Sequence, residues 1–290
     1  MGANDQDPKG RKELRASQRS DSATLVARPR SSDPSPPRQD ASMSHAESTP
    51  SRLKTAIILC QVLELEIEHF ASGDPYIVRI ERLKQGLHNE PAKLQKQVQE
   101  SVDAVERETD AEAIVLGYGL CSRGTEKIRC QRCLLVVPRA HDCITLLLGD
   151  KQRYADYVAK HPGTYWYSPG WIKHHLPPGP DRAEAMYREY CEKYGEDNAQ
   201  FLIESERHWH DNYQRAAFVD VGGIGRTDKD IEYTRKCADW LGWEFDQQLG
   251  DPGLMRELVE GPWSPERFLV VPPGKTLRMS GDERVIEVAD

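Results

Sequence analysis

Short apolar runs alternate with polar, helix-like stretches along most of the chain. The runs lie at residues 55–62, 113–116, 134–137, 216–221 and 268–271. Continuous apolar runs of this length are typical of strands that are buried on both faces of a sheet. Strands that alternate with helices predict an α/β fold with a mainly parallel sheet. We expect helices on both faces of this sheet, in a Rossmann-like three-layer arrangement.

The polar stretches between these runs show helical spacing. Residues 91–107 place Leu94, Val98, Val102 and Val105 on one face, and Pro91 suits the first turn of a helix. Further helices are expected at 228–241, which Gly242 would end, at 252–260, and as two charged surface helices within 181–211. Residues 164–167 predict a short aromatic strand, and 144–148 a helix or a continuation of the core.

Residues 1–53 differ in composition from the rest of the chain. They consist mostly of Ser, Pro, Arg, Asp and Gln and contain few large apolar residues. Such a segment buries too little surface to offset its ordering entropy, so we predict a disordered tail, or an over-extended start with Met43 as the initiator. A transit peptide fits less well, because acidic residues such as Asp5, Asp7 and Glu13 occur throughout. Residues 54–290 are expected to form a single domain.

Charge and hydropathy exclude several classes of protein. The net charge is −8, and the predicted domain has no long basic block, which argues against nucleic-acid binding. No apolar run reaches the roughly 18 residues of a membrane span. We therefore expect a cytoplasmic protein that binds no membrane. The sequence leaves its oligomeric state open. The seven cysteines are an odd number without a secretion signal, which favours thiol, metal or redox chemistry over disulfides.

Cysteine and histidine residues follow the first three predicted strands. Cys60 ends the first apolar run, Cys121 follows the second, and His141 and Cys143 follow the third. Because the carboxyl ends of parallel strands open into the ligand crevice, we predict a metal site formed by these four residues. Zinc is expected first, with iron or cobalt as alternatives. His141 and Cys143 can face the same side only if the backbone between them is extended. The competing interpretation is that the cysteines are small apolar core residues.

A CxxC pair offers a second set of thiols. Cys130 and Cys133 have the spacing of a zinc knuckle, but a closed site needs two more ligands. Cys121 and Cys143 are the nearest candidates, which gives an alternative set. Otherwise the pair lies in an exposed loop.

Other residues suggest how a ligand would be held. Gly117 and Gly119 would let the loop that carries Cys121 approach a cofactor or substrate closely, which makes Cys121 the first candidate for a catalytic residue. Asp220 ends a predicted strand before the glycines at 222–225, and is a second catalytic candidate; the glycines themselves favour a tight turn over an anion site. Trp171 would either cover a flat cofactor or pack in the core.

The remaining histidine pairs lie in polar surroundings. His174, His175, His208 and His210 lack a cysteine or acidic partner at a recognised spacing, so we assign them to the surface.

Three segments together resemble the DUF1638 family. They are residues 117–121, residues 138–149 and residues 163–171, and the strand at 268–271 and Cys60 resemble that family as well. Genes of this family often lie beside those of corrinoid-dependent methyltransferases, so the resemblance implies a link to methyl transfer, with a corrinoid as cofactor and a small molecule or a corrinoid protein as partner. The CxxC pair departs from the family's apolar, Gly-containing stretch at this place.

Two kinds of activity remain open. In the first, a thiolate-bound metal serves an enzyme or accessory factor of corrinoid-dependent methyl transfer. In the second, the protein is a metal-free cysteine enzyme in which Cys60 and Cys121 act as an acid–base pair, as in racemases, with His141 lowering their pKa. A non-catalytic module that binds a corrinoid or a partner protein is a third alternative.

Overall fold

The computed structural model describes residues 52–290, with the side chains of residues 206–208 left aside. The predicted tail lies almost wholly outside the described residues, so this segment and the domain boundaries stay predictions. The strands and helices run in the order β1 (Thr55–Cys60), η1 (Gln61–Leu63), α1 (Glu64–Ala71), β2 (Ile77–Leu83), η2 (Leu87–Asn89), α2 (Pro91–Glu108), β3 (Ala113–Gly117), β4 (Leu134–Pro138), α3 (Cys143–Leu148), α4 (Lys151–Lys160), β5 (Thr164–Tyr167), α5 (Pro169–His174), α6 (Pro180–Tyr194), α7 (Glu196–Arg207), η3 (His208–Asn212), β6 (Arg215–Asp220), α8 (Asp228–Leu241), β7 (Glu244–Leu249), α9 (Gly253–Glu260), β8 (Phe268–Val271), β9 (Thr276–Met279) and β10 (Ile286–Ala289).

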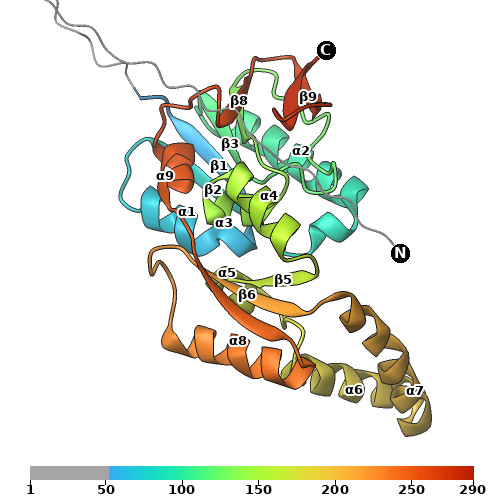
Figure 1. Ribbon diagram of the computed structural model, residues 1–290. Coiled ribbons are helices and arrows are strands. Elements are labelled where there is room, and N and C mark those ends of the chain that lie inside the picture. The colour runs from blue at the N-terminus through green and yellow to red at the C-terminus, as the bar shows by residue number, and fades with distance from the viewer. Residues whose placement is uncertain (1–51) are drawn as a thin grey trace, which may run out of the picture. The chain divides into compact units, whose positions relative to one another are not determined.

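The central sheet has five strands in the order β2-β1-β3-β4-β8. Its first four strands are mutually parallel, and only β8 runs antiparallel, beside β4. The chain steps from β1 to β2 in one direction and from β2 over β1 to β3 in the other, so α1 and α2 cover opposite faces (Figure 1). Helix α9 packs on α1 and contacts β3. The predicted α/β fold with a mainly parallel sheet is confirmed.

A second, three-stranded sheet has the order β5-β6-β7 and is entirely parallel. Helix α8 packs against β6 and β7 (Figure 1). A separate core of mostly aromatic residues, including Tyr167, Phe218 and Trp243, lies beside this sheet. The apolar runs do not reveal this division, because the buried strand β6 of this sheet is as apolar as the buried strand β1 of the central sheet.

Several predicted elements are confirmed in detail. Helix α2 starts with Pro91 in its first turn and buries the predicted apolar face. Helix α8 ends at Gly242, which adopts a φ of 70° and donates its N–H to the last turn. In contrast, β2 was not predicted. It is the edge strand of the central sheet and carries Arg79, Glu81 and Arg82, so its composition hides its role.

Candidate functional site

Three thiols meet at the carboxyl edge of the central sheet. Cys60 is the last residue of β1, Cys121 follows β3, and Cys143 follows β4. All three line one inner chamber of about 20 Å³, together with Gly117, Tyr118, His88 and Trp171. A space of this size holds about one water molecule or ion. The structure therefore brings together the three cysteines of the predicted set.

A larger cavity adjoins the inner chamber. Its volume is about 580 Å³, which lies in the range of sites for small organic molecules. Cys121, Cys143 and Trp171 line both spaces, whereas His141 lines only the larger cavity. Asp142 between His141 and Cys143 is extended, with φ −155° and ψ −178°, so both neighbouring side chains can face the cavity.

The loop after β3 is held against the loop after β4. The backbone N–H groups of Leu120 and Cys121 donate to the carbonyl oxygens of Ala140 and His141, each over 2.8 Å. A Cβ at Gly119 would lie 2.7 Å from the backbone nitrogen of Asp142, which no real side chain tolerates. Gly119 thus permits a close approach between two protein loops; the predicted approach of this loop to a ligand stays a prediction.

Gly117 has a related role at the end of β3. It lines the inner chamber, and a Cβ at this position would lie 2.7 Å from Ile67 Cδ1 and 2.7 Å from Leu59 Cβ. The requirement for glycine here comes from packing between β1, β3 and α1.

Cys121 begins a left-handed turn. Cys121, Ser122 and Arg123 have φ values of 46°, 56° and 68°, a region that non-glycine residues seldom adopt. Each such residue costs about 1–2 kcal/mol. The turn is retained because the Gly124 N–H donates to the Cys121 carbonyl over 2.9 Å and Arg123 pairs with Glu126. Strain of this kind tends to gather at functional sites.

Asp142 fixes the position of Cys143. Its carboxylate accepts the backbone N–H of Thr145 over 3.1 Å and so caps α3, whose first residue is Cys143. The other carboxylate oxygen accepts the hydroxyl of Tyr154 over 2.9 Å. The ring of Tyr154, from α4, in turn contacts Trp166 of β5, with centroids 6.2 Å apart. Asp142 is therefore fully engaged within the protein.

Burial determines the protonation state of the three thiols that line the inner chamber. It raises the pKa of the Cys60, Cys121 and Cys143 thiols above the ordinary cysteine value. The neighbouring Cys60 and Asp142 raise the pKa of Cys121 further. The activation of the thiols by His141 stays a prediction.

Two imidazoles that sequence analysis did not select lie beside Trp171. His88 stacks on the indole with centroids 6.3 Å apart, and His175 meets its edge at 5.3 Å. Both line the larger cavity, and burial lowers the pKa of both, so they are neutral near pH 7. The surface assignment of His175 is thus wrong. His88 follows β2, so the rule that selected the strand-end cysteines would have found it once that strand was recognised.

The other histidines of that group lie elsewhere. His174 is largely buried and pairs with Glu64, together with Lys173. His210 packs on Trp209 and Trp243. The side chain of His208 lies outside the described residues.

Trp171 belongs to the short helix α5. Ser168 caps α5 by accepting the Trp171 N–H over 3.1 Å, and this places the indole in the wall of both spaces. Its Nε1–H is buried and has no acceptor among the described residues.

Asp220 lies apart from the residues that line the cavity. Its carboxylate accepts the Gly223 N–H over 2.8 Å and lies 3.6 Å from the Arg226 guanidinium. Gly222, Gly223 and Gly225 all have left-handed φ values, as a tight turn requires. In this arrangement Asp220 stabilises the turn after β6.

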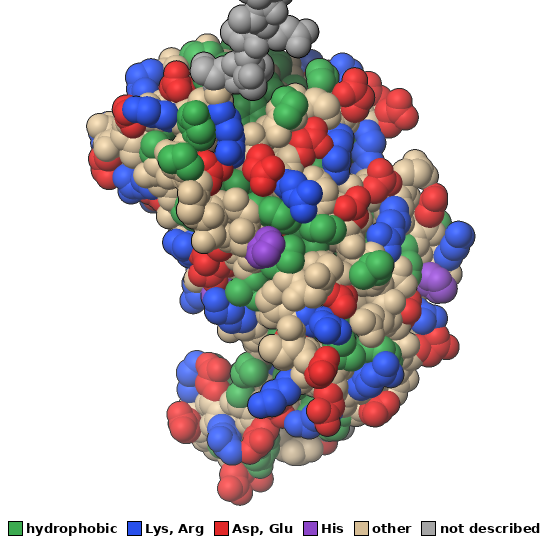
Figure 2. Space-filling model, turned by 90° about the vertical axis from the view of Figure 1, so that its left-hand side faces the viewer, with side chains coloured by type: hydrophobic (Ala, Val, Ile, Leu, Met, Phe, Trp, Pro, Cys, Tyr) green, Lys and Arg blue, Asp and Glu red, His purple; other side chains and the backbone are tan. Residues whose placement is uncertain are grey.

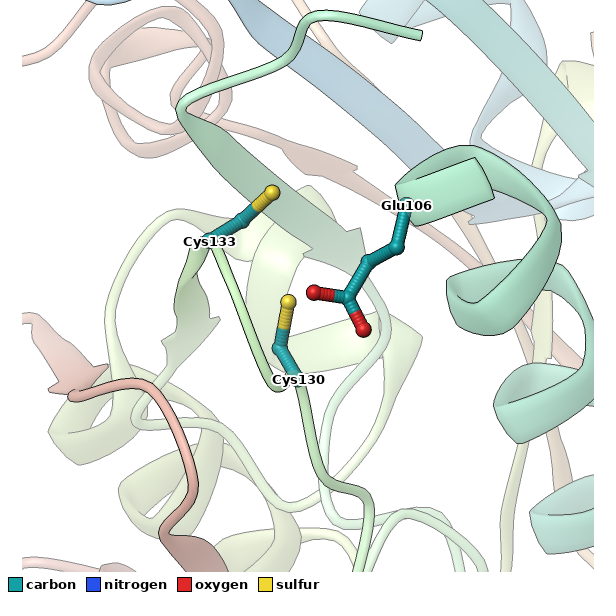
Figure 3. Close-up of side chains that lie close together, drawn as sticks. All are labelled: Glu106, Cys130 and Cys133. Atoms are coloured by element: carbon teal, nitrogen blue, oxygen red, sulfur yellow. The ribbon is translucent and has the colours of Figure 1, made fainter. Parts of the chain in front are cut away.

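A second group of potential metal ligands occupies the opposite edge of the central sheet. Glu106, Cys130 and Cys133 point toward one another (Figure 3), and among the described residues they alone form a group of three with ligand atoms all within 4.8 Å. The Glu106 carboxylate accepts the backbone N–H groups of Gln131 and Arg132. The Cys133 thiol donates to the Ala111 carbonyl over 3.0 Å. The group thus already has protein partners.

This placement excludes the alternative set of Cys121, Cys130, Cys133 and Cys143. Cys133 directly precedes β4, whereas Cys143 follows its carboxyl end. A strand of this length spans about 15 Å, too far for one ion to bridge.

Comparison with known families places the chain. Residues 82–259, more than half of the sequence, match the family model described as a protein of unknown function, DUF1638. The chain belongs to the DUF1638 family. The matched region contains Cys121, His141, Cys143 and Trp171, and Cys60 precedes it. No curated protein and no solved structure matches the chain.

The surface and the helices add two observations. On the face shown in Figure 2, acidic and basic side chains are interspersed without a large patch of either sign. In the part of the chain that the structure describes, no helix combines the length and the apolar character needed to cross a membrane.

Proposed function

We propose that the protein binds a transition metal at the strand-end thiols and holds a small molecule in the adjoining cavity, as an enzyme or accessory factor of corrinoid-dependent methyl transfer. The observation that carries this proposal is the convergence of Cys60, Cys121 and Cys143 on one chamber. Three loops from three parallel strands supply them, and such an edge is where α/β proteins place their ligands.

The donor set suits a soft or borderline metal. Three sulfurs with a neutral imidazole from His88 or His141 match the ligands of zinc, and iron or cobalt would accept them too. The thiols do not form a group within 4.8 Å of one another, so their side chains would turn inward around an ion. When bound, such a metal would hold sulfur as thiolate and supply a Lewis acid.

The rest of the site concerns the small molecule. The larger cavity has the volume for a small methyl acceptor or donor, and Cys121 stands where the two spaces join. Cys121 is accordingly our candidate for the residue that contacts the reacting group. The corrinoid, whether free or carried by a partner protein, enters the proposal through the family resemblance.

The metal-free alternative is less well supported. Cys60 and Cys121 do come from the neighbouring strands β1 and β3 and line the same chamber, as an acid–base pair would. Burial, however, raises the pKa of both thiols, so neither is a thiolate at neutral pH.

Metal analysis of the full-length protein purified without oxygen tests the proposal. We expect close to one equivalent of a transition metal, lost in Cys60→Ser, Cys121→Ser and Cys143→Ser. Cys191→Ser is the matched control, because this cysteine lies on α6 outside both spaces and should leave the metal content unchanged. If the metal is lost only in Cys130→Ser or Cys133→Ser, the ion binds at the group of Glu106, Cys130 and Cys133 instead.

Titration with cobalamin, methylcobalamin and a corrinoid protein tests the corrinoid link, followed by absorbance and calorimetry. Binding of at least one of the three, weakened by Cys121→Ser, is expected. A metal-loaded protein that binds none of them would end the link to corrinoids and leave the metal site standing.

A further inference from the structure

The larger cavity contains one arginine without an acidic partner. Arg182 lies in the first turn of α6 and lines the cavity. Its guanidinium lies 3.4 Å from His175 Nε2 and 5.8 Å from the centre of the Trp209 ring. In the described part of the chain no carboxylate pairs with it. The neighbouring Asp181 is engaged with Lys236.

The remaining lining does not neutralise this charge. Asp142 is the acidic residue among the cavity walls; its carboxylate keeps its charge but is bound to Thr145 and Tyr154, and among the described residues it forms no ion pair with Arg182. His175, whose Nε2 lies 3.4 Å from the Arg182 guanidinium, has a lowered pKa and is neutral near pH 7. A cation that is partly removed from water and unpaired is costly, and an anionic ligand would remove that cost.

The walls also define the body of the ligand. Tyr165, Trp166 and Trp171 line the cavity and present apolar ring surfaces. Trp171 continues into the inner chamber, where it lies beside the thiols. A ligand held at Arg182 can therefore lie along aromatic rings with its other end toward Cys121 and Cys143.

We propose that the larger cavity binds a small organic carboxylate, with its carboxylate on Arg182 and its apolar body on Trp171. This deepens the proposed function, on which it rests, by naming the class of the small molecule. The planar guanidinium donates two parallel hydrogen bonds to a carboxylate, a geometry that a neutral amide cannot match.

Calorimetric titration of the full-length protein with benzoate and with benzamide tests the proposal, since the two probes share a ring and differ in charge. We expect saturable benzoate binding and about ten- to hundred-fold weaker benzamide binding. Arg182→Met should weaken benzoate binding by a similar factor. Arg182→Lys keeps the charge but loses the bidentate geometry, so its affinity for benzoate should lie between those of the native protein and Arg182→Met.

Arg188→Met is the matched control. This arginine lies on the same helix, is exposed and pairs with Glu184, so benzoate should bind this variant as it binds the native protein. Three results would each overturn the proposal: no benzoate binding, equal binding of the two probes, or benzoate binding that Arg182→Met leaves unchanged.

Measuring the metal content distinguishes a failure of the carboxylate site from a failure of the thiol metal site. Arg182→Met should keep its metal, because the residue lies outside the thiol chamber. A native protein without metal that still distinguishes benzoate from benzamide through Arg182 would refute the thiol site and uphold the carboxylate site. A metal-loaded protein that binds benzoate and benzamide equally would uphold the thiol site and refute the carboxylate site.

Discussion

The backbone N–H of Cys121 donates to the carbonyl oxygen of His141 over 2.8 Å. This bond joins the loops that follow β3 and β4, so the cysteine of one loop and the His-Asp-Cys segment of the other are positioned as one unit. Because the bond uses only backbone groups, the side chains of Cys121 and His141 stay available to a ligand. Substitutions that disturb the backbone here should therefore affect all strand-end residues together.

The first prediction concerns Gly119. Gly119→Ala should lower the free energy of unfolding by about 1–3 kcal/mol, because the new Cβ would collide with the Asp142 backbone. Chemical denaturation measures this change. Gly281→Ala is the control, since a Cβ there meets nothing within 4 Å and φ is not left-handed. Equal stabilities of the two variants would show that the two loops are not packed as described.

The second prediction concerns the way in which Asp142 holds Cys143 through the cap of α3. Asp142→Ala and Asp150→Ala each remove a helix cap, of α3 and α4 respectively, and each lost cap should cost about 1 kcal/mol; Asp142→Ala also removes the bond to Tyr154 and should cost more. Only Asp142→Ala should increase the rate at which Cys143 reacts with a thiol reagent, because that cap holds the first residue of α3. Identical labelling of Cys143 in both variants would contradict this role.

The third prediction concerns Glu66. This residue of α1 is fully buried, its carboxylate has no partner among the described residues, and burial raises its pKa from 4.5 to about 7. The folded protein then holds a proton that the unfolded chain releases, so stability falls as pH rises from about 4.5 to 7. Glu66→Gln should match the native protein near pH 4 and exceed it by roughly 3 kcal/mol at pH 8.

Urea denaturation at both pH values provides the test of Glu66. A difference between variant and native protein that stays constant with pH would show that the carboxyl titrates normally and is not buried in the folded state.

The fourth prediction addresses Glu106. Glu106→Ala leaves the N–H groups of Gln131 and Arg132 without their acceptor and should lower stability by about 1–3 kcal/mol. Glu100→Ala on the same helix, exposed and paired only loosely with Lys96, should change stability little. Thermal unfolding in the presence of a chelator compares the two without any contribution from metal. Unchanged stability of Glu106→Ala would mean that its carboxylate does not organise the CxxC loop.

Much of the site follows from the order of strands and residues along the chain. The rule that parallel strands share a carboxyl edge was enough to bring Cys60, Cys121 and Cys143 together, because each lies at the end of an apolar run or a few residues after it. The same rule failed for His88, since the polar edge strand before it gives no apolar run. It also gave Asp220 too much weight, because β6 belongs to a different sheet from the thiol-bearing strands.

Other features depend on contacts that no local pattern records. The position of His175 in the cavity follows from the short helix α5, whose cap Ser168 is a single residue directly after the aromatic strand β5. Glu106 accepts N–H groups from a loop far along the chain, so sequence spacing alone could not pair it with Cys130 and Cys133. The protonation of the thiols likewise depends on burial, which residue identity does not specify.

The link from Asp142 through Tyr154 to Trp166 has a consequence for selectivity. Asp142 belongs to the loop on the thiol side of the cavity and Trp166 to the aromatic wall on the β5 side, and the Tyr154 side chain touches both. The Tyr154 side chain therefore links these two walls before any ligand arrives. Widening the gap between the walls would break the bond between Tyr154 and Asp142. We therefore expect the protein to disfavour molecules that need a wider gap.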